Sequence, residues 1–393
     1  MSSAKDIFKR NQAQTFPFPS SLEIDSAKGS YIYDVKGKAY LDFVAGVSAC
    51  TLGHSNPIIT DAVSEQINKY SHVMVYGEFI QSPQYKLAKL LANNLPEKLS
   101  TTYFTNSGAE AIEGAMKLAK RATGRPEIIS CKDSYHGSTQ GALSIMGNEQ
   151  YKSKYRPLLP SCNQIIYNNV DSLTKITKQT AAVVIEPIQG GSGFITPSNN
   201  FLQEVREKCN KTGTLLIFDE IQTCFGRLGT LFGFEKYGVI PDILCIAKGM
   251  GGGMPIGAFI SSWELMNLFT FNPLLGHITT FGGHPVNCAA SLATLHNLLD
   301  TDIMHKVSEK EQIFKLNLKH PKIKIIRGNG LMLAIEFDDE KLAKKVVEQS
   351  LENGLILFYF LFTKTAVRIT PPLTISNKEI IKGCNIIKKI LET

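Results

Sequence analysis

The chain has 393 residues and a formal net charge of +7, and 43% of its residues are apolar, 20% charged and 9% aromatic. This is ordinary globular composition, which excludes a disordered chain, a collagen and a small disulfide scaffold, and the length favours two structural regions in one compact unit. The positive charge is modest and forms no long run, so a nucleic-acid partner is not expected. The charge does suit attraction of acidic small molecules.

The first residues, MSSAKDIFKRNQAQTFPFPS, lack the apolar core of a secretory signal. No stretch reaches the roughly 18 apolar residues of a membrane helix. The eight cysteines are scattered without a C-x-x-C pair, which is typical of reduced thiols. We therefore expect a cytoplasmic protein without a membrane partner.

The predicted elements, in chain order, begin with a hairpin over residues 29–43, where apolar and polar residues alternate around Lys36-Gly37. In the middle of the chain, short β-branched runs alternate with longer amphipathic stretches. That alternation is typical of strands joined by crossover helices in a mostly parallel sheet. The expected middle elements are strands at 101–105, 182–185, 214–218 and 243–247, and a helix at 109–121.

The C-terminal part, from residue 323 onward, mixes strands with a helix expected over 340–353, and the apolar run 355–362 reads as a buried strand. The prediction is thus an α/β protein whose two chain ends pack together as a smaller α+β domain. The expected ranges are 1–54 for the N-terminal segment, 55–290 for the large domain and 291–393 for the C-terminal part.

A residue whose side chain can bind a ligand or take part in catalysis stands at the end of each of the four predicted central strands. Asn106, Glu186, Asp219 and Lys248 each stand at or just beyond a strand end. Ligands of open α/β sheets bind beyond the carboxyl ends of the strands, so the four side chains are expected to line one crevice.

Lys248 lies between an apolar strand and a glycine-rich turn, in ILCIAKGMGGGMPIG. An apolar setting lowers a lysine pKa and makes the neutral amine accessible, as Schiff-base chemistry with an aldehyde requires. A surface lysine or a phosphate-binding turn is the alternative, although no GxxxxGK[ST] pattern is present.

Asp219 ends an apolar strand, where a carboxylate is costly unless it meets a cation such as a pyridinium nitrogen. A capping or salt-bridged aspartate is the alternative. The run from Asn106 to Ala109 joins a strand to a helix and predicts either an anion site or a simple N-cap. Tyr135 and His136 could cover a flat ring or fill the core, and no histidine shows metal-ligand spacing.

Together these segments resemble the class III, ornithine-type aminotransferases, which use pyridoxal phosphate and have fold type I. The resemblance runs from Gly29 to Leu373. It is carried by TNSGAEAIEGAMKLAK, DSYHGST, VVIEPIQG, LLIFDEIQTCFGRLG, ILCIAKGMGGGMPIGA, HITTFGGHPVNCAA and VRITPPLTI in this order. It implies a large domain with a mostly parallel sheet, a smaller α+β domain and a homodimer with two shared active sites.

The resemblance also implies roles for individual residues. Lys248 would form the internal aldimine and move the proton, and Asp219 would pair with the pyridine nitrogen. The remaining cofactor-binding residues would be Ser107, Gly108 and Ala109 around the phosphate, Tyr135 and Ile221 on the two ring faces, Gln222 beside the ring hydroxyl, Glu186 as a nearby carboxylate behind these groups, His136, and Thr280 at the partner's phosphate. Arg368 would bind a substrate carboxylate, and a structural strand-end arginine is the alternative.

Two positions depart from the family pattern. Ser138 stands where acetylornithine, ornithine and 4-aminobutyrate aminotransferases usually have an arginine, and Gly191 stands where a glutamate usually follows EPIQG. Both changes remove charge from the substrate side, which leaves Arg368 as the expected carboxylate anchor.

The resulting prediction is transfer of an amino group from an amino acid or ω-amine to 2-oxoglutarate or pyruvate. An aminomutase, a racemase, a decarboxylase or a catalytically silent binding protein on the same scaffold are the alternatives.

Overall fold

The computed structural model describes residues 3–198 and 200–393. Its centre is a seven-stranded sheet in the order β4-β10-β9-β8-β7-β5-β6. The strands are β4 (Thr101–Thr105), β5 (Glu127–Cys131), β6 (Cys162–Ile165), β7 (Thr180–Ile185), β8 (Leu215–Asp219), β9 (Ile243–Ile246) and β10 (Gly257–Ser261). All run parallel except β10, which is antiparallel to both of its neighbours.

Both faces of this sheet are covered, which explains the continuous apolar runs of its strands. Val184 and Ile217 pack with Ile112 of α5 (Gly108–Thr123) in one apolar cluster. Val183 and Phe218 point the other way and belong to a second cluster with Phe201 of α7 (Phe201–Thr212).

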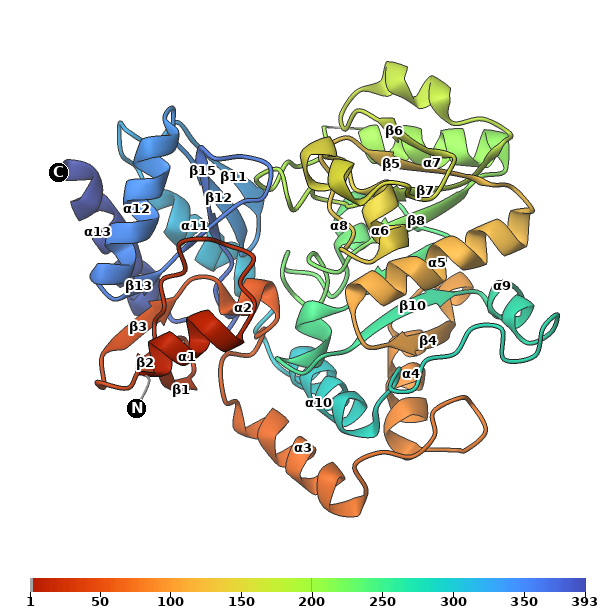
Figure 1. The fold of residues 1–393 in the computed structure, drawn as a ribbon, viewed down its shortest axis with the longest axis horizontal. Coiled ribbons are helices and arrows are strands. Elements are labelled where there is room, and N and C mark those ends of the chain that lie inside the picture. The colour runs from red at the N-terminus through yellow and green to blue at the C-terminus, as the bar shows by residue number, and fades with distance from the viewer. Residues whose placement is uncertain (1–2, 199) are drawn as a thin grey trace.

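The two chain ends lie side by side in Figure 1, red and blue at the left of the central sheet. One small sheet has the order β1-β2-β3-β13, and the other has the order β11-β12-β15-β14. In the first, the C-terminal β13 pairs in parallel with the N-terminal β3, with Leu355 opposite Leu41. Their strands are β1 (Ile24–Lys28), β2 (Tyr31–Asp34), β3 (Ala39–Asp42), β11 (Ile325–Asn329), β12 (Met332–Glu336), β13 (Leu355–Ile356), β14 (Phe358–Tyr359) and β15 (Ala366–Ile369).

The remaining α-helices surround these sheets. They are α1 (Ala4–Asn11), α2 (Ala45–Ser48), α3 (Pro57–Lys69), α4 (Ser82–Asn93), α6 (Gln140–Ile145), α8 (Gly233–Tyr237), α9 (Trp263–Met266), α10 (Pro285–Asp300), α11 (Val307–Asn317), α12 (Glu340–Glu352) and α13 (Asn377–Glu392). None of the helices in the described ranges is long and apolar enough to cross a membrane. Helix α10 continues through residue 290, so the predicted domain boundary falls inside one helix, and the division into domains stays a prediction.

The predicted hairpin is present as β2 and β3, which pair antiparallel around Lys36-Gly37. The predicted middle strands agree with β4, β7, β8 and β9 to within two residues. The prediction of one buried strand over residues 355–362 is wrong. That run is divided between β13 and β14, and Phe358 is 54% exposed.

Candidate active site

A cavity of about 610 Å³ lies at the carboxyl ends of the central strands. Asn106, Glu186, Asp219 and Lys248 all line it, as the strand-end argument predicts. Further predicted site residues in the lining are Ser107, Gly108, Ala109, Tyr135, His136, Ile221, Gln222 and Arg368. The cavity therefore brings together residues that span more than 260 positions of the chain.

The N-terminus of helix α5 forms one end of the cavity. Ser107 is the N-cap, and its hydroxyl oxygen accepts a hydrogen bond from the Glu110 backbone N–H at 3.2 Å. A Cβ on Gly108 would lie 2.6 Å from Cδ1 of Ile221, so only glycine lets the helix start approach that side chain. Free N–H groups and the helix dipole make this end suitable for an anion.

Asp219 is held by two hydrogen bonds at the end of β8. Its Oδ2 lies 2.7 Å from Nδ1 of His136, and its Oδ1 accepts from the Ile221 backbone N–H at 3.0 Å. Burial alone would lower the pKa of His136, but the hydrogen bond and charge of Asp219 outweigh it and raise that pKa. The contact with His136 orients the carboxylate, and Nε2 of His136 is buried without a partner among the described residues.

Glu186 and Gln222 also line the cavity. Glu186 accepts hydrogen bonds from the backbone N–H groups of Tyr135 at 3.1 Å and Gly190 at 2.7 Å. Burial raises the pKa of Glu186 to about 7, a shift that the charge of nearby His136 opposes. The amide of Gln222 donates to the Ser48 hydroxyl at 3.1 Å.

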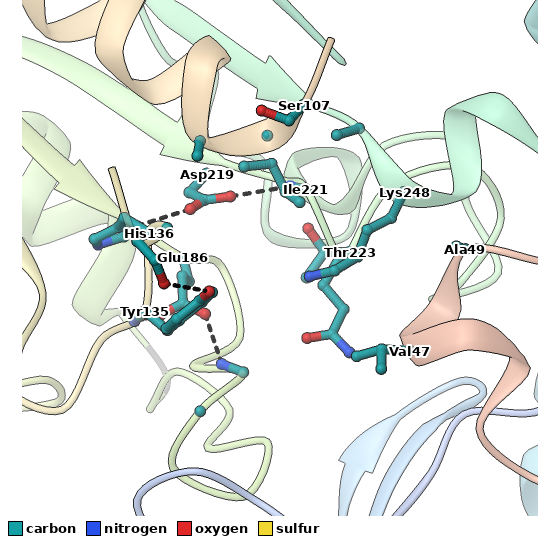
Figure 2. Close-up of a pocket in the computed structure, with 18 of the residues that line it drawn as sticks. Val47, Ala49, Ser107, Tyr135, His136, Glu186, Asp219, Ile221, Thr223 and Lys248 are labelled. Atoms are coloured by element: carbon teal, nitrogen blue, oxygen red, sulfur yellow. Dashed lines mark hydrogen bonds and ion pairs between the residues drawn. The ribbon is translucent and has the colours of Figure 1, made fainter. Parts of the chain in front are cut away.

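Lys248 follows β9 and enters the cavity from the side opposite Tyr135, His136 and Asp219 (Figure 2). Its backbone has a φ of 44°, a left-handed conformation that is strained for a side chain of this size. Burial lowers the pKa of the ammonium, although Asp219 opposes the shift. No hydrogen bond or ion pair holds the ammonium among the described residues, and the lowered pKa favours the neutral, nucleophilic amine relative to an exposed lysine.

Arg368 lies on β15 and is only 6% exposed. Its Nε donates to the Tyr359 carbonyl at 3.2 Å, and its guanidinium lies 4.9 Å from the ring centre of Phe360. Burial lowers the pKa of Arg368 to about 10. Within the described ranges no carboxylate forms an ion pair with it, so the guanidinium faces the cavity ready for an external anion.

Thr280 is the one predicted site residue that does not line this cavity. It is exposed on the segment between Gly276 and α10. Sequence reasoning in turn missed the wall formed by Phe358, Tyr359, Phe360 and Leu361. An uninterrupted apolar run has no periodicity that separates a cavity wall from a core strand, so no signal in the sequence marks it.

Comparisons with known proteins agree with this geometry. Residues 13–391 match the family described as Aminotransferase class-III. The acetylornithine aminotransferase of Clostridium acetobutylicum is 36% identical over 385 residues, which cover 95% of this chain and 97% of that protein.

Two solved structures share the fold over nearly their whole length. A transaminase from the marine bacterium Virgibacillus matches with a TM-score of 0.93 and 26% identity, covering 99% of this chain and 98% of that one. An amine transaminase from an uncultivated Pseudomonas species, solved with pyridoxal phosphate bound, matches with a TM-score of 0.89 and 25% identity, covering 98% and 99% of the two chains. The chain therefore belongs to the class III aminotransferase family and is a pyridoxal-phosphate-dependent aminotransferase.

Proposed function

We propose that Arg368 is the carboxylate anchor of this aminotransferase, which moves an amino group from an amino acid or ω-amine to a 2-oxo acid at Lys248. The observation that carries the proposal is a buried guanidinium without an acidic partner among the described residues, in the same cavity as the lysine. Both substrates of a transaminase use the site in turn, so one anchor serves the amino acid and the oxo acid.

The residues present fit the cofactor of the family. Ser107, Gly108 and Ala109, at the start of α5, would hold the phosphate through N–H groups and a hydroxyl. Asp219 has lone pairs left after its two hydrogen bonds and would hold the pyridine nitrogen. When bound, pyridoxal phosphate supplies an aldehyde for the amine and an electron sink for the carbon that loses its proton.

The protein's own groups would then orient and move protons. His136 would orient Asp219 through its 2.7 Å contact, and Tyr135 and Ile221 would cover the two ring faces. Gln222 would lie beside the ring hydroxyl, and Glu186 behind it. Lys248 would carry the proton between the substrate carbon and the cofactor, because burial makes its neutral form accessible.

Replacing Arg368 by Gln tests the anchor. We expect the Michaelis constants of the amino donor and of the oxo acid to rise together, by about tenfold to a hundredfold, since an ion pair in a buried site is lost from both complexes. The visible absorbance of the bound cofactor should remain. Unchanged Michaelis constants for both substrates would exclude Arg368 as the anchor.

The proposed assembly is a homodimer in which Thr280 of one subunit reaches the cofactor phosphate of the other. Thr280 is exposed, and its neighbour Thr279 accepts a hydrogen bond from Asn106 at the cavity rim at 2.9 Å. Phe281 follows and is 52% exposed. Gln84 of α4 donates to the Gly283 carbonyl at 2.8 Å, and Ile80, which precedes α4, is 93% exposed. Exposed apolar side chains beside a site are typical of a subunit interface.

A cytoplasmic location is supported by the cysteines. All eight are free, and six of them are buried. Unpaired thiols in these numbers suit a reducing compartment.

A further inference from the structure

The cavity has an apolar wall next to its carboxylate anchor. Phe358, Tyr359, Phe360 and Leu361 form this wall, and the hydroxyl of Tyr359 is the only polar side-chain group in it. Strand β14 pairs antiparallel with β15, which places Phe358 directly opposite Arg368. Any molecule that pairs its carboxylate with Arg368 therefore has the apolar wall beside it.

The wall is fixed at its far end by Phe362. Its backbone N–H donates to the Gly191 carbonyl at 3.0 Å, and a Cβ on residue 191 would lie 2.6 Å from the Phe362 ring. The Tyr151 hydroxyl also donates to the Leu361 carbonyl at 2.8 Å, and its ring packs edge-on against Phe362 at 5.3 Å. An aromatic ring thus fills the space that a side chain at position 191 would take, and the wall is preorganised.

Among the described residues, the cavity lining offers no second cation that is free to pair with a second carboxylate. In the part of the chain that the structure describes, the basic side chains of its lining are His136, Lys248 and Arg368. His136 is already paired with Asp219, and Lys248 performs the chemistry. A substrate with two carboxylates would leave one of them against phenyl rings without a partner, and burying an unpaired charge is strongly unfavourable.

We propose that both substrates of this enzyme are monocarboxylates with an apolar remainder: amino acids with uncharged apolar side chains, and the corresponding 2-oxo acids. Arg368 holds the carboxylate, and the remainder packs against Phe358 and Leu361. This inference rests on the proposed role of Arg368 and adds the substrate class. Dicarboxylates such as glutamate and 2-oxoglutarate are then poor substrates.

Binding of two unreactive probes tests the wall without turnover. Pentanoate and pentanedioate differ only in a terminal methyl group or carboxylate, and calorimetry on the holoenzyme gives their dissociation constants. We expect pentanoate to bind at least about tenfold more tightly than pentanedioate, because its terminal methyl group is buried and no carboxylate is left without a cation. Equal binding, or tighter binding of pentanedioate, would overturn the inference.

The first half-reaction, in which the amino donor reacts with the holoenzyme and leaves as an oxo acid, tests the same inference by its rate. Release of 2-oxopentanoate from L-norvaline and of 2-oxoglutarate from L-glutamate is measured in single turnovers. Norvaline should have the larger second-order rate constant. Leu361→Ser should lower the ratio of the norvaline constant to the glutamate constant about threefold to tenfold, since it removes an apolar contact that favours the apolar side chain alone.

Leu316→Ser is the matched control, since Leu316 is 61% exposed, compared with 42% for Leu361, and does not line the cavity. It should change neither constant. Ser138→Arg, which adds a second cation at the cavity, should raise the glutamate constant relative to that of norvaline.

The outcomes separate the two proposals. Faster reaction of glutamate, with both donors weakened by Arg368→Gln, would overturn the apolar class and leave the anchor standing. If Arg368→Gln affects neither donor, the anchor fails and the inference falls with it. A Leu361→Ser variant that lowers both constants equally would also overturn the apolar contact.

Discussion

Asp42 and His54 form a pair that supports the cavity from outside. Asp42 Oδ2 lies 2.8 Å from His54 Nε2, and its Oδ1 accepts from the backbone N–H groups of Val44 and Ala45. These bonds hold the turn in which Ala45, Val47 and Ser48 all have positive φ. Val47 lines the cavity, and Ser48 accepts the hydrogen bond of Gln222. One ion pair therefore stabilises a strained turn beside the site.

This pair predicts a pH dependence of stability. The hydrogen bond with Asp42 raises the pKa of His54 from 6.5 to about 10. The folded protein then keeps a proton that the unfolded chain releases above pH 6.5, so the stabilisation is complete below that pH and is lost as pH rises toward 10. The slope should stay below about 1.4 kcal/mol per pH unit, because His54 is partly exposed and solvent screens the pair.

Thermal unfolding between neutral pH and pH 9.5 checks this prediction. The melting temperature of the wild type should fall more steeply than that of His54→Gln. His305→Gln, which changes an exposed histidine, should follow the wild type. Parallel curves for the wild type and His54→Gln would contradict the assignment.

At the scale of elements, the position of the segment between β13 and β15 is fixed by its contact with Gly191. The backbone of Gly191 is outside the left-handed region, so its conformation is compatible with alanine. The methyl group of an alanine would, however, collide with the ring of Phe362. Gly191→Ala should therefore cost about 1–3 kcal/mol of unfolding free energy.

A double-mutant cycle with Phe362→Ala isolates this contact, with unfolding free energies taken from denaturant titrations. The double variant should be more stable than the sum of the single changes implies, by about 1 kcal/mol, because the smaller side chain at 362 makes room for the methyl group. Strictly additive effects would show that the ring does not limit position 191.

Four of the seven strands of the central sheet could be predicted because their signals are local. β7, β8 and β9 are short apolar runs bounded by polar residues, and burial on both faces follows from that pattern, whereas β4 at the sheet edge is predicted from its β-branched and aromatic residues. The run 355–362 is also apolar, but it is divided between two short strands and is only partly buried. Its exposure is set by the cavity and by distant partners such as Gly191 and Tyr151, more than 160 residues away in the chain, and no local pattern contains them.

The candidate site was predictable for the same reason, since strand ends in a parallel sheet meet at one edge. Asp219 and Lys248 could be placed in one crevice from their positions alone, at the end of β8 and just after β9. The pairing of Asp219 with His136 could not, because the histidine follows β5, two strands away in the sheet.

For the whole molecule, the proposed homodimer with shared active sites predicts complementation between two inactive variants. Lys248→Ala lacks the amine, and Thr280→Asp would repel the partner's cofactor phosphate. In a mixed dimer, one of the two sites combines the intact lysine of one subunit with the intact threonine of the other. Mixing equal amounts under subunit exchange should restore roughly a quarter of the wild-type activity.

Each variant alone should stay inactive under the same exchange conditions, which serves as the control. Ile80→Asp should prevent the recovery by weakening the interface, and size-exclusion chromatography would report the loss of dimer. An active Thr280→Asp variant on its own would show that the two sites are independent.

The pairing of β14 with β15 has a consequence for the evolution of specificity. Residues 358–362 are tied at one end to the strand that carries Arg368 and at the other to Gly191. Neither of these two contacts involves Lys248 or Asp219, so the sequence of the stretch can change without changing the contacts of those two residues. New substrate preferences can therefore arise by exchange of this five-residue stretch while the reaction chemistry is inherited unchanged.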